Sequence, residues 1–232
     1  MKEIPLIDIV AVFWFLLCWR GYAFFAERMS TRRPSLLVSV NEFRVNWMRQ
    51  MLGRDNRMMD ASLVGNLLRS ISFFASTTIF IVLGLFTLLK YREEASDILT
   101  AIPYTLPATP VLWEARVFLL MTIFVYAFFK YTWSLRQYNY VCAFIGAAPP
   151  ANARNSHFEQ YAQNGASLIS NAARHFNFGL RGYYFGLAAL SWFINAYAFM
   201  FATAWVVWIL YRREFLSRAL HYLDPAIFRY QE

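Results

Sequence analysis

The sequence predicts an all-α integral membrane protein. We expect a helical bundle of five transmembrane helices, or four if the last apolar run is a single span, with an additional cytoplasmic amphipathic helix. Hydrophobic residues make up 59% of the 232 residues, whereas soluble domains contain about 45–50%. They gather in runs longer than globular core helices need. We expect residues 1–232 to form a single transmembrane domain.

The net charge of +8 does not indicate a nucleic-acid-binding protein. The basic residues cluster in the loops between the apolar runs, as they do in cytoplasmic loops of membrane proteins. No zinc, RNP or recognition-helix pattern accompanies them. The predicted partner is therefore the lipid bilayer, and nucleic acid is not expected.

The first predicted span covers residues 4–26. It is not interpreted as a signal peptide, because Trp14 and Trp19 continue its apolar core, Arg20 interrupts it and no small-residue cleavage site precedes Glu27.

The second predicted span covers residues 63–89, with Asp60 or Ser62 as its expected start. Before it, apolar positions recur at spacings of three and four over residues 41–52. That spacing predicts an amphipathic helix, which either lies on an anionic membrane surface or packs under the bundle. After it, three prolines predict an ordered loop over residues 90–110.

The third predicted span covers residues 111–134, in a helical pattern that continues to about residue 145. The polar residues 151–173 follow with helical spacing, and the same face leads on to Arg181. A helix is therefore expected to run from the aqueous side into the bilayer.

The last apolar run, residues 182–210, is long for one span and short for two, since one span needs about 20 residues. It forms either one tilted helix or two antiparallel helices, over 174–194 and 197–213, that turn near Asn195. The positive-inside rule favours two, because the C-terminal arginines and the arginine-rich loop 27–61 then share a side. We therefore expect a protein of the bacterial inner membrane with its N-terminus outside and its C-terminus in the cytoplasm.

Four strings resemble the DUF599 family of bacterial and plant membranes. They are residues 66–79 (NLLRSISFFASTTI), 135–140 (LRQYNY), 176–185 (FNFGLRGYYF) and 219–224 (ALHYLD). The resemblance covers most of the chain in the right order. It implies a multi-pass membrane protein and carries no known activity or catalytic residue.

Three arginines, Arg20, Arg69 and Arg181, are expected in the cytoplasmic leaflet of the five-span arrangement. Charges there are costly unless they face water, the bundle interior or lipid phosphates. They form either a cationic belt for an anion or a lipid headgroup, or snorkelling side chains that pair with helix carbonyls. A predicted polar pathway face accompanies them, where the alternative is ordinary helix packing; its residues are Asn66, Ser76, Thr77, Asn171 and Arg174.

The sequence offers no support for catalysis or for a cofactor. Only His175 among the histidines lies near a span, so haem is not expected. Asp8 and Glu114 near the outer face are expected to be solvated or ion-paired surface charges. Cys18 and Cys142 have no metal-ligand spacing and are expected to be small buried hydrophobes. We therefore expect a protein that is not an enzyme and holds no metal.

The predicted function is a homo-oligomeric channel or transporter for a small, anionic solute, lined by the polar faces of the second and fourth helices. The alternative is an accessory or assembly subunit of a larger membrane complex, whose aromatic-rich surfaces would be partner interfaces.

Overall fold

The computed structural model describes residues 4–30, 36–101, 104–105, 108–152, 157–217 and 222–223. These residues form helices and their connections, with no strand among them. The fourth family-like string, 219–224, lies outside the described residues except for 222–223. The helices are α1 (Leu6–Ser30), α2 (Leu36–Leu52), α3 (Met58–Lys90), α4 (Arg92–Thr100), α5 (Pro110–Gly146), α6 (Phe158–Leu190), the short 3₁₀ helix η1 (Ser191–Phe193) and α7 (Ala196–Phe215).

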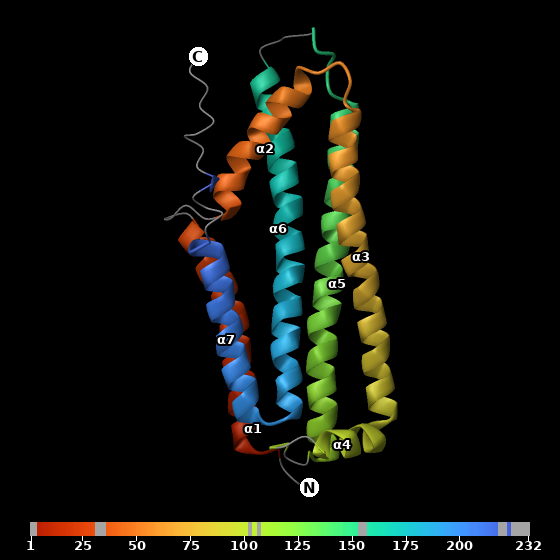
Figure 1. Ribbon diagram of the computed structural model, residues 1–232, viewed down its shortest axis with the longest axis vertical. Coiled ribbons are helices and arrows are strands. Elements are labelled where there is room, and N and C mark those ends of the chain that lie inside the picture. Colours follow the sequence, from red (N-terminus) through yellow and green to blue (C-terminus); the bar gives the residue numbers. More distant parts are fainter. Residues whose placement is uncertain are drawn as a thin grey trace.

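Three long helices, α3, α5 and α6, run side by side and form the body of the molecule (Figure 1). α1 and α7 form a parallel pair beside the lower part of α6, and α4 lies across the lower end. α2 slants across the upper part of α6. The molecule therefore has a lower end with the α6–α7 turn and an upper end with α2.

The lengths of the helices divide the bundle into two levels. α5 has 37 residues, which corresponds to about 55 Å of helix, whereas the hydrocarbon core of a bilayer is about 30 Å thick. α5 is therefore about 25 Å longer than the hydrocarbon core, close to half of its own length, and α2 packs at its upper part. There α2 buries Met48, Met51 and Leu52 in a core shared with α5 and α6. Of the two positions predicted for the amphipathic helix, packing on the bundle is the observed one.

Three described helices are long and apolar enough to cross a membrane: α1 over Leu6–Ala26, α3 and α5. They contain most of the first predicted span and all of the second and third. α6 and α7 do not reach the same apolar character, because polar residues fill the first half of α6 and Arg212, Arg213 and Glu214 end α7. Their crossing of the membrane remains a prediction.

The last apolar run is divided into two helices, so a single tilted helix is the wrong alternative. α6 ends at Leu190, η1 follows, and α7 starts after Asn195. Asn195 has an extended backbone, and its side-chain oxygen accepts a hydrogen bond from the backbone N of Ala198 at 2.8 Å. This N-cap stabilises the start of α7 and lets the chain reverse direction where the polar residue interrupts the apolar run.

The start of α3 differs from the prediction. α3 begins at Met58, and Asp60 lies fully buried inside its first turn instead of capping it. One oxygen of Asp60 accepts hydrogen bonds from the indole of Trp47 at 2.7 Å and from Arg54 at 2.8 Å. Asp60 therefore ties the end of α2 to the start of α3, which a linear capping pattern does not reveal.

The predicted loop 90–110 also contains a helix, α4. Its first turn carries Glu93 and Glu94, whose negative charges interact favourably with the positive end of the helix dipole. The prolines predicted to exclude helix lie beyond it, and Pro110 starts α5 as its first residue, capped by Thr109.

Close contact between α5 and α6 forms the centre of the bundle. Small residues of α6 face rings of α5. A Cβ atom added at Gly179 would lie 2.5 Å from Tyr131, and one at Gly186 would lie 2.9 Å from Phe124. Because these positions are seven residues apart in both antiparallel helices, successive rings of α5 meet successive glycines of α6.

We expect Gly179→Ala to lower the free energy of unfolding by about 1–3 kcal/mol, because the new methyl group would overlap the fully buried ring of Tyr131. Thermal unfolding in detergent measures the effect. Gly84→Ala in α3 is the matched control, since nothing lies within 4 Å of its added Cβ. Equal melting temperatures for the two variants would contradict the packing described here.

Candidate functional site

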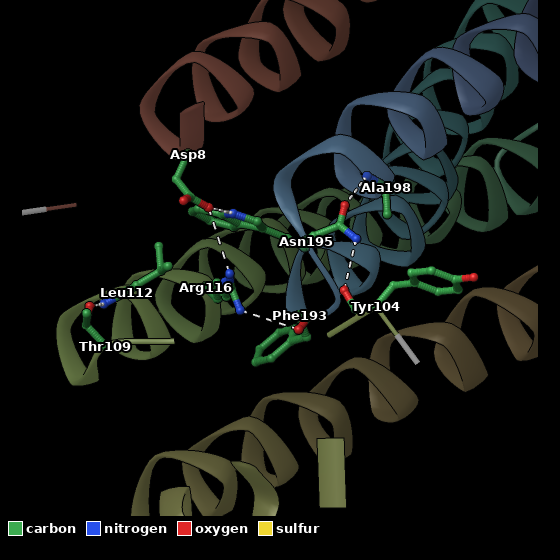
Figure 2. Close-up of polar contacts among 9 residues, drawn as sticks. Asp8, Tyr104, Thr109, Leu112, Arg116, Phe193, Asn195 and Ala198 are labelled. Atoms are coloured by element: carbon green, nitrogen blue, oxygen red, sulfur yellow. Dashed lines mark hydrogen bonds and ion pairs between the residues drawn. The ribbon is translucent and has the colours of Figure 1, made fainter. Parts of the chain in front are cut away.

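A buried charge pair lies at the lower end of the bundle, where Asp8 of α1 approaches Arg116 of α5 (Figure 2). Asp8 Oδ1 accepts a hydrogen bond from the Trp192 indole at 2.7 Å and lies 3.8 Å from Arg116 Nη2. Arg116 Nη1 donates to the Phe193 carbonyl at 3.4 Å. The Asp8 cluster, which we define as these four residues, joins α1 and α5 to the turn between α6 and α7.

The buried state of this pair corrects the expectation for the outer carboxylates. Asp8 is ion-paired, which was one of the two alternatives, but it is only 5% exposed and Arg116 only 3%, so the pair is buried and does not lie on the surface. Glu114 is exposed, as expected for a surface charge. Arg116, two residues after Glu114 in the sequence, instead pairs with Asp8 of the first helix.

A second charge cluster lies where α7 ends. Arg181 Nη2 donates to both carboxylate oxygens of Glu214, at 2.8 and 3.0 Å. The Tyr22 hydroxyl of α1 donates to Glu214 Oε2 at 3.0 Å. Arg181 is 9% exposed, and its guanidinium carbon lies 5.4 Å from the Tyr22 ring centroid and 5.7 Å from that of Phe178.

Helix geometry explains why these side chains converge. Arg181 lies nine residues before the end of α6, about 14 Å above it, whereas Glu214 lies eighteen residues into α7, about 27 Å along it. Side chains tilt toward the N-terminus of their helix. Because α6 and α7 are antiparallel (Figure 1), Arg181 tilts upward and Glu214 tilts downward. The arginine thus snorkels from an apolar depth to its partner.

The Arg181 pocket, a cavity of about 130 Å³, opens beside this pair. Its cationic members are Arg181 and Arg213, and Glu214 is its acidic member. Arg213 Nη1 donates to the Tyr184 hydroxyl. Asn177, Leu180 and Leu210 complete the lining. Two guanidinium groups against one carboxylate leave a net positive charge, which suits an anion.

The structure does not bring the three predicted belt arginines into one site. Arg181 lines the pocket, whereas Arg69 is exposed on α3 and donates to Asn66 of its own helix. Arg20 is exposed on α1. It lies two residues from Tyr22, and therefore on nearly the opposite side of that helix.

Among the predicted polar pathway residues, Asn66, Ser76 and Arg174 are exposed, whereas Thr77 and Asn171 are half-buried. Asn66 accepts from Arg69, the Thr77 hydroxyl donates to the Phe73 carbonyl, and Asn171 accepts from Arg174. These side chains therefore do not line a path through a single bundle.

Sequence reasoning missed the partners Glu214, Tyr22 and Arg213. One signal points to Glu214: it is the only acidic residue between Glu159 and residue 223, and it follows a long apolar run. A lone carboxylate among five arginines, Arg174, Arg181, Arg212, Arg213 and Arg218, favours pairing. Which arginine it selects depends on the α6–α7 turn.

Among the described residues, no group of three or more His, Cys, Asp or Glu could hold a metal ion. Cys142 is exposed and Cys18 is half-buried, so the expectation of burial is wrong for Cys142.

The three helices that are long and apolar enough to cross a membrane define the class: this is a helical membrane protein. Residues 10–219 match the family model described as "Protein of unknown function, DUF599". The chain therefore belongs to the DUF599 family, as the sequence strings predicted. No curated protein and no solved structure matches it.

We expect Asp8→Asn to destabilise the protein by about 3–5 kcal/mol, because asparagine keeps the acceptor for Trp192 but leaves Arg116 buried without a counter-charge. Glu114→Gln is the matched control on an exposed position and should change stability by less than about 0.5 kcal/mol. Thermal unfolding followed by tryptophan fluorescence measures both. A wild-type melting temperature for D8N would exclude a stabilising ion pair.

Proposed function

We propose that this protein is a homo-oligomeric, non-enzymatic membrane transport protein or channel for a small anion, and that the anion binds in the Arg181 pocket. The observation that carries the proposal is the nine-tenths buried guanidinium of Arg181, which shares a pocket with the exposed Arg213. Ionisable residues within membrane helices are rare and mark ion or substrate pathways.

The α3 surface supports the oligomeric part of the proposal. α3 is a candidate span, yet it exposes Asn66, Ser70 and Ser76 on its outer side. Polar groups facing lipid favour association with another helix, where they form interhelical hydrogen bonds. A second copy of the chain would cover this face, and the copies together would line the path that one bundle lacks.

The distribution of charge supports five spans with the upper end in the cytoplasm. The upper end contains Arg44, Arg49, Arg54 and Arg57 of the α2–α3 region, whereas the lower end contains the two basic residues Lys90 and Arg92 beside the acidic residues Glu93, Glu94, Asp97 and Glu114. Cytoplasmic segments carry the excess of basic residues. The N-terminus is then outside and the C-terminus inside, in the inner membrane of a bacterial cell.

Cysteine labelling tests this topology. Cys142 in the upper level is exposed, as are Leu216 after α7 and Ile98 on α4. In a Cys18→Ala background, a membrane-impermeant maleimide should label Cys142 only in inside-out vesicles. With Cys142 also removed, L216C should label from that same side and I98C from the opposite side. Labelling of L216C and I98C from one side would show that α6 and α7 together cross only once.

Anion flux from proteoliposomes tests the transport function. We expect Arg213→Gln to weaken the apparent affinity for acetate about tenfold, because it removes a charged donor worth about 1.5 kcal/mol from the pocket. Arg212→Gln is the matched control, since this adjacent exposed arginine does not line the pocket. R20Q and R69Q should also behave like the wild type. A flux equal to that of empty vesicles would exclude the proposal, and equal losses in R20Q, R69Q and R181Q would favour the three-arginine belt.

The rival proposal, an accessory subunit, is supported by an exposed aromatic row on α7: Tyr197, Phe201, Trp205 and Trp208. Spacings of three and four place these rings on one face, which suits either lipid or a partner helix. Crosslinking in native membranes that returns only copies of this chain would argue against a larger complex.

A further inference from the structure

The carboxylate of Glu214 occupies the position that an anion would take on Arg181. Both of its oxygens accept from Arg181 Nη2, and Oε2 accepts a third hydrogen bond from Tyr22. Three hydrogen bonds from two donor groups, Arg181 Nη2 and the Tyr22 hydroxyl, form a seat for an oxyanion of similar size. The chain itself fills this seat in the present conformation.

Glu214 lies at the end of α7, where a movement of its side chain disturbs few other contacts. It is the last residue but one of α7, which ends at Phe215. A negative charge near a helix C-terminus is unfavourable, because that end of the helix dipole is itself negative. Arg181 and Tyr22 therefore supply most of what holds the carboxylate in place, and its side chain can leave without breaking the turns of α7 below it.

Arg181 has capacity for a second ligand. Its Nη1 atom is buried and has no hydrogen-bond partner among the described residues, while Nη2 carries both contacts to Glu214. Unpaired buried donors are costly, and a guanidinium can bind an oxyanion with two parallel N–H groups. The present arrangement uses only part of the donor set that Arg181 offers.

We propose that Glu214 is a built-in competitor for the anion site, so that the site takes an oxyanion, a carboxylate or a phosphate group, together with one proton. This rests on the proposed anion function. When Glu214 is protonated it loses its charge and releases Arg181 Nη2. The incoming anion then takes the vacated position, and the binding of one anion with one proton leaves the charge of the site unchanged.

Other charged and titratable groups face Glu214 from each neighbouring helix. Tyr22 contacts it from α1 and Arg181 from α6, while Arg213 of α7 donates to the Tyr184 hydroxyl of α6. Glu214 is the only carboxylate in this set. Because proton uptake assists binding, affinity should rise as the pH falls. Where one proton is taken up for each anion bound, the apparent dissociation constant should increase about tenfold per pH unit.

Calorimetry on the full-length protein in detergent tests this coupling with acetate as the probe. Titrations at pH 6.0, 7.0 and 8.0 in buffers of different ionisation enthalpy should give an uptake of about one proton per acetate at the higher pH values. An uptake of zero with acetate still bound would overturn the coupling but keep the anion site. Absence of binding by acetate and inorganic phosphate at every pH would overturn both proposals.

Glu214→Gln provides the second arm, because it keeps the size of the side chain and removes its charge. We expect E214Q to bind acetate at least tenfold more tightly than the wild type at pH 8.0, with no pH dependence. Glu159→Gln, a carboxylate on the upper half of α6 that pairs with Arg49, is the control and should retain the wild-type pH dependence. An unchanged affinity in E214Q would overturn the competition, and the wild-type proton count tests the coupling even if E214Q does not fold.

Nanodiscs distinguish a free anion from a lipid phosphate. If a free oxyanion is the ligand, acetate affinity should be the same in phosphatidylcholine and in phosphatidylglycerol nanodiscs. If the phosphate of an anionic lipid occupies the seat, phosphatidylglycerol should abolish acetate binding in the wild type and in E214Q alike. Either result supports an oxyanion seat, and acetate binding that survives Arg181→Gln would place the anion elsewhere and overturn it.

Discussion

The contact between α5 and α6 is the constraint on which the rest of the structure depends. Gly179 and Gly186 of α6 make room for the rings of Tyr131 and Phe124 of α5. The Ser134 hydroxyl of α5 also donates a hydrogen bond to the Ala172 carbonyl of α6 at 2.7 Å. In a bilayer, close packing rather than exclusion of water drives helices together, so small residues opposite large rings decide which helices pair. With α5 and α6 fixed, α3 packs on α5 and α2 packs on α6.

The two charge clusters attach α1 and α7 to the bundle, one through Asp8 near the start of α1 and the other through Glu214 near the end of α7. α1 reaches the turn after α6 through Asp8, and it reaches α6 and α7 through Tyr22 and Glu214. Buried pairs of this kind add little net stability over apolar contacts but are costly to break. These pairs therefore determine the position of α1 and α7 more than they raise the stability of the bundle. A pair in which one member can be neutralised by a proton is a natural point for the helices to respond to a ligand.

Much of the fold follows from periodicity and composition, and the errors have physical causes. The break at Asn195 was predictable, because a polar residue that can cap a helix interrupts an apolar run near its middle. α4 was missed because its acidic first turn resembles a loop in composition. Asp60 was misassigned as a cap because capping rules are local, whereas its partner Trp47 comes from another helix. For the site, the sequence identified Arg181 and failed to associate it with Glu214.

The sequence by itself determined that the protein is helical and membrane-embedded, because the lengths of apolar runs and the loop charges reflect the bilayer directly. It also determined that Arg181 is unusual, since an arginine in such a run is costly wherever it lies. Only the tertiary structure decided its partner. Arg181 and Glu214 meet because α6 and α7 are antiparallel and their side chains tilt toward each other. Arg20 and Arg69 are similar in sequence context, but the packing of α1 and α3 leaves both side chains exposed. The arginines that line the pocket are Arg181 and Arg213.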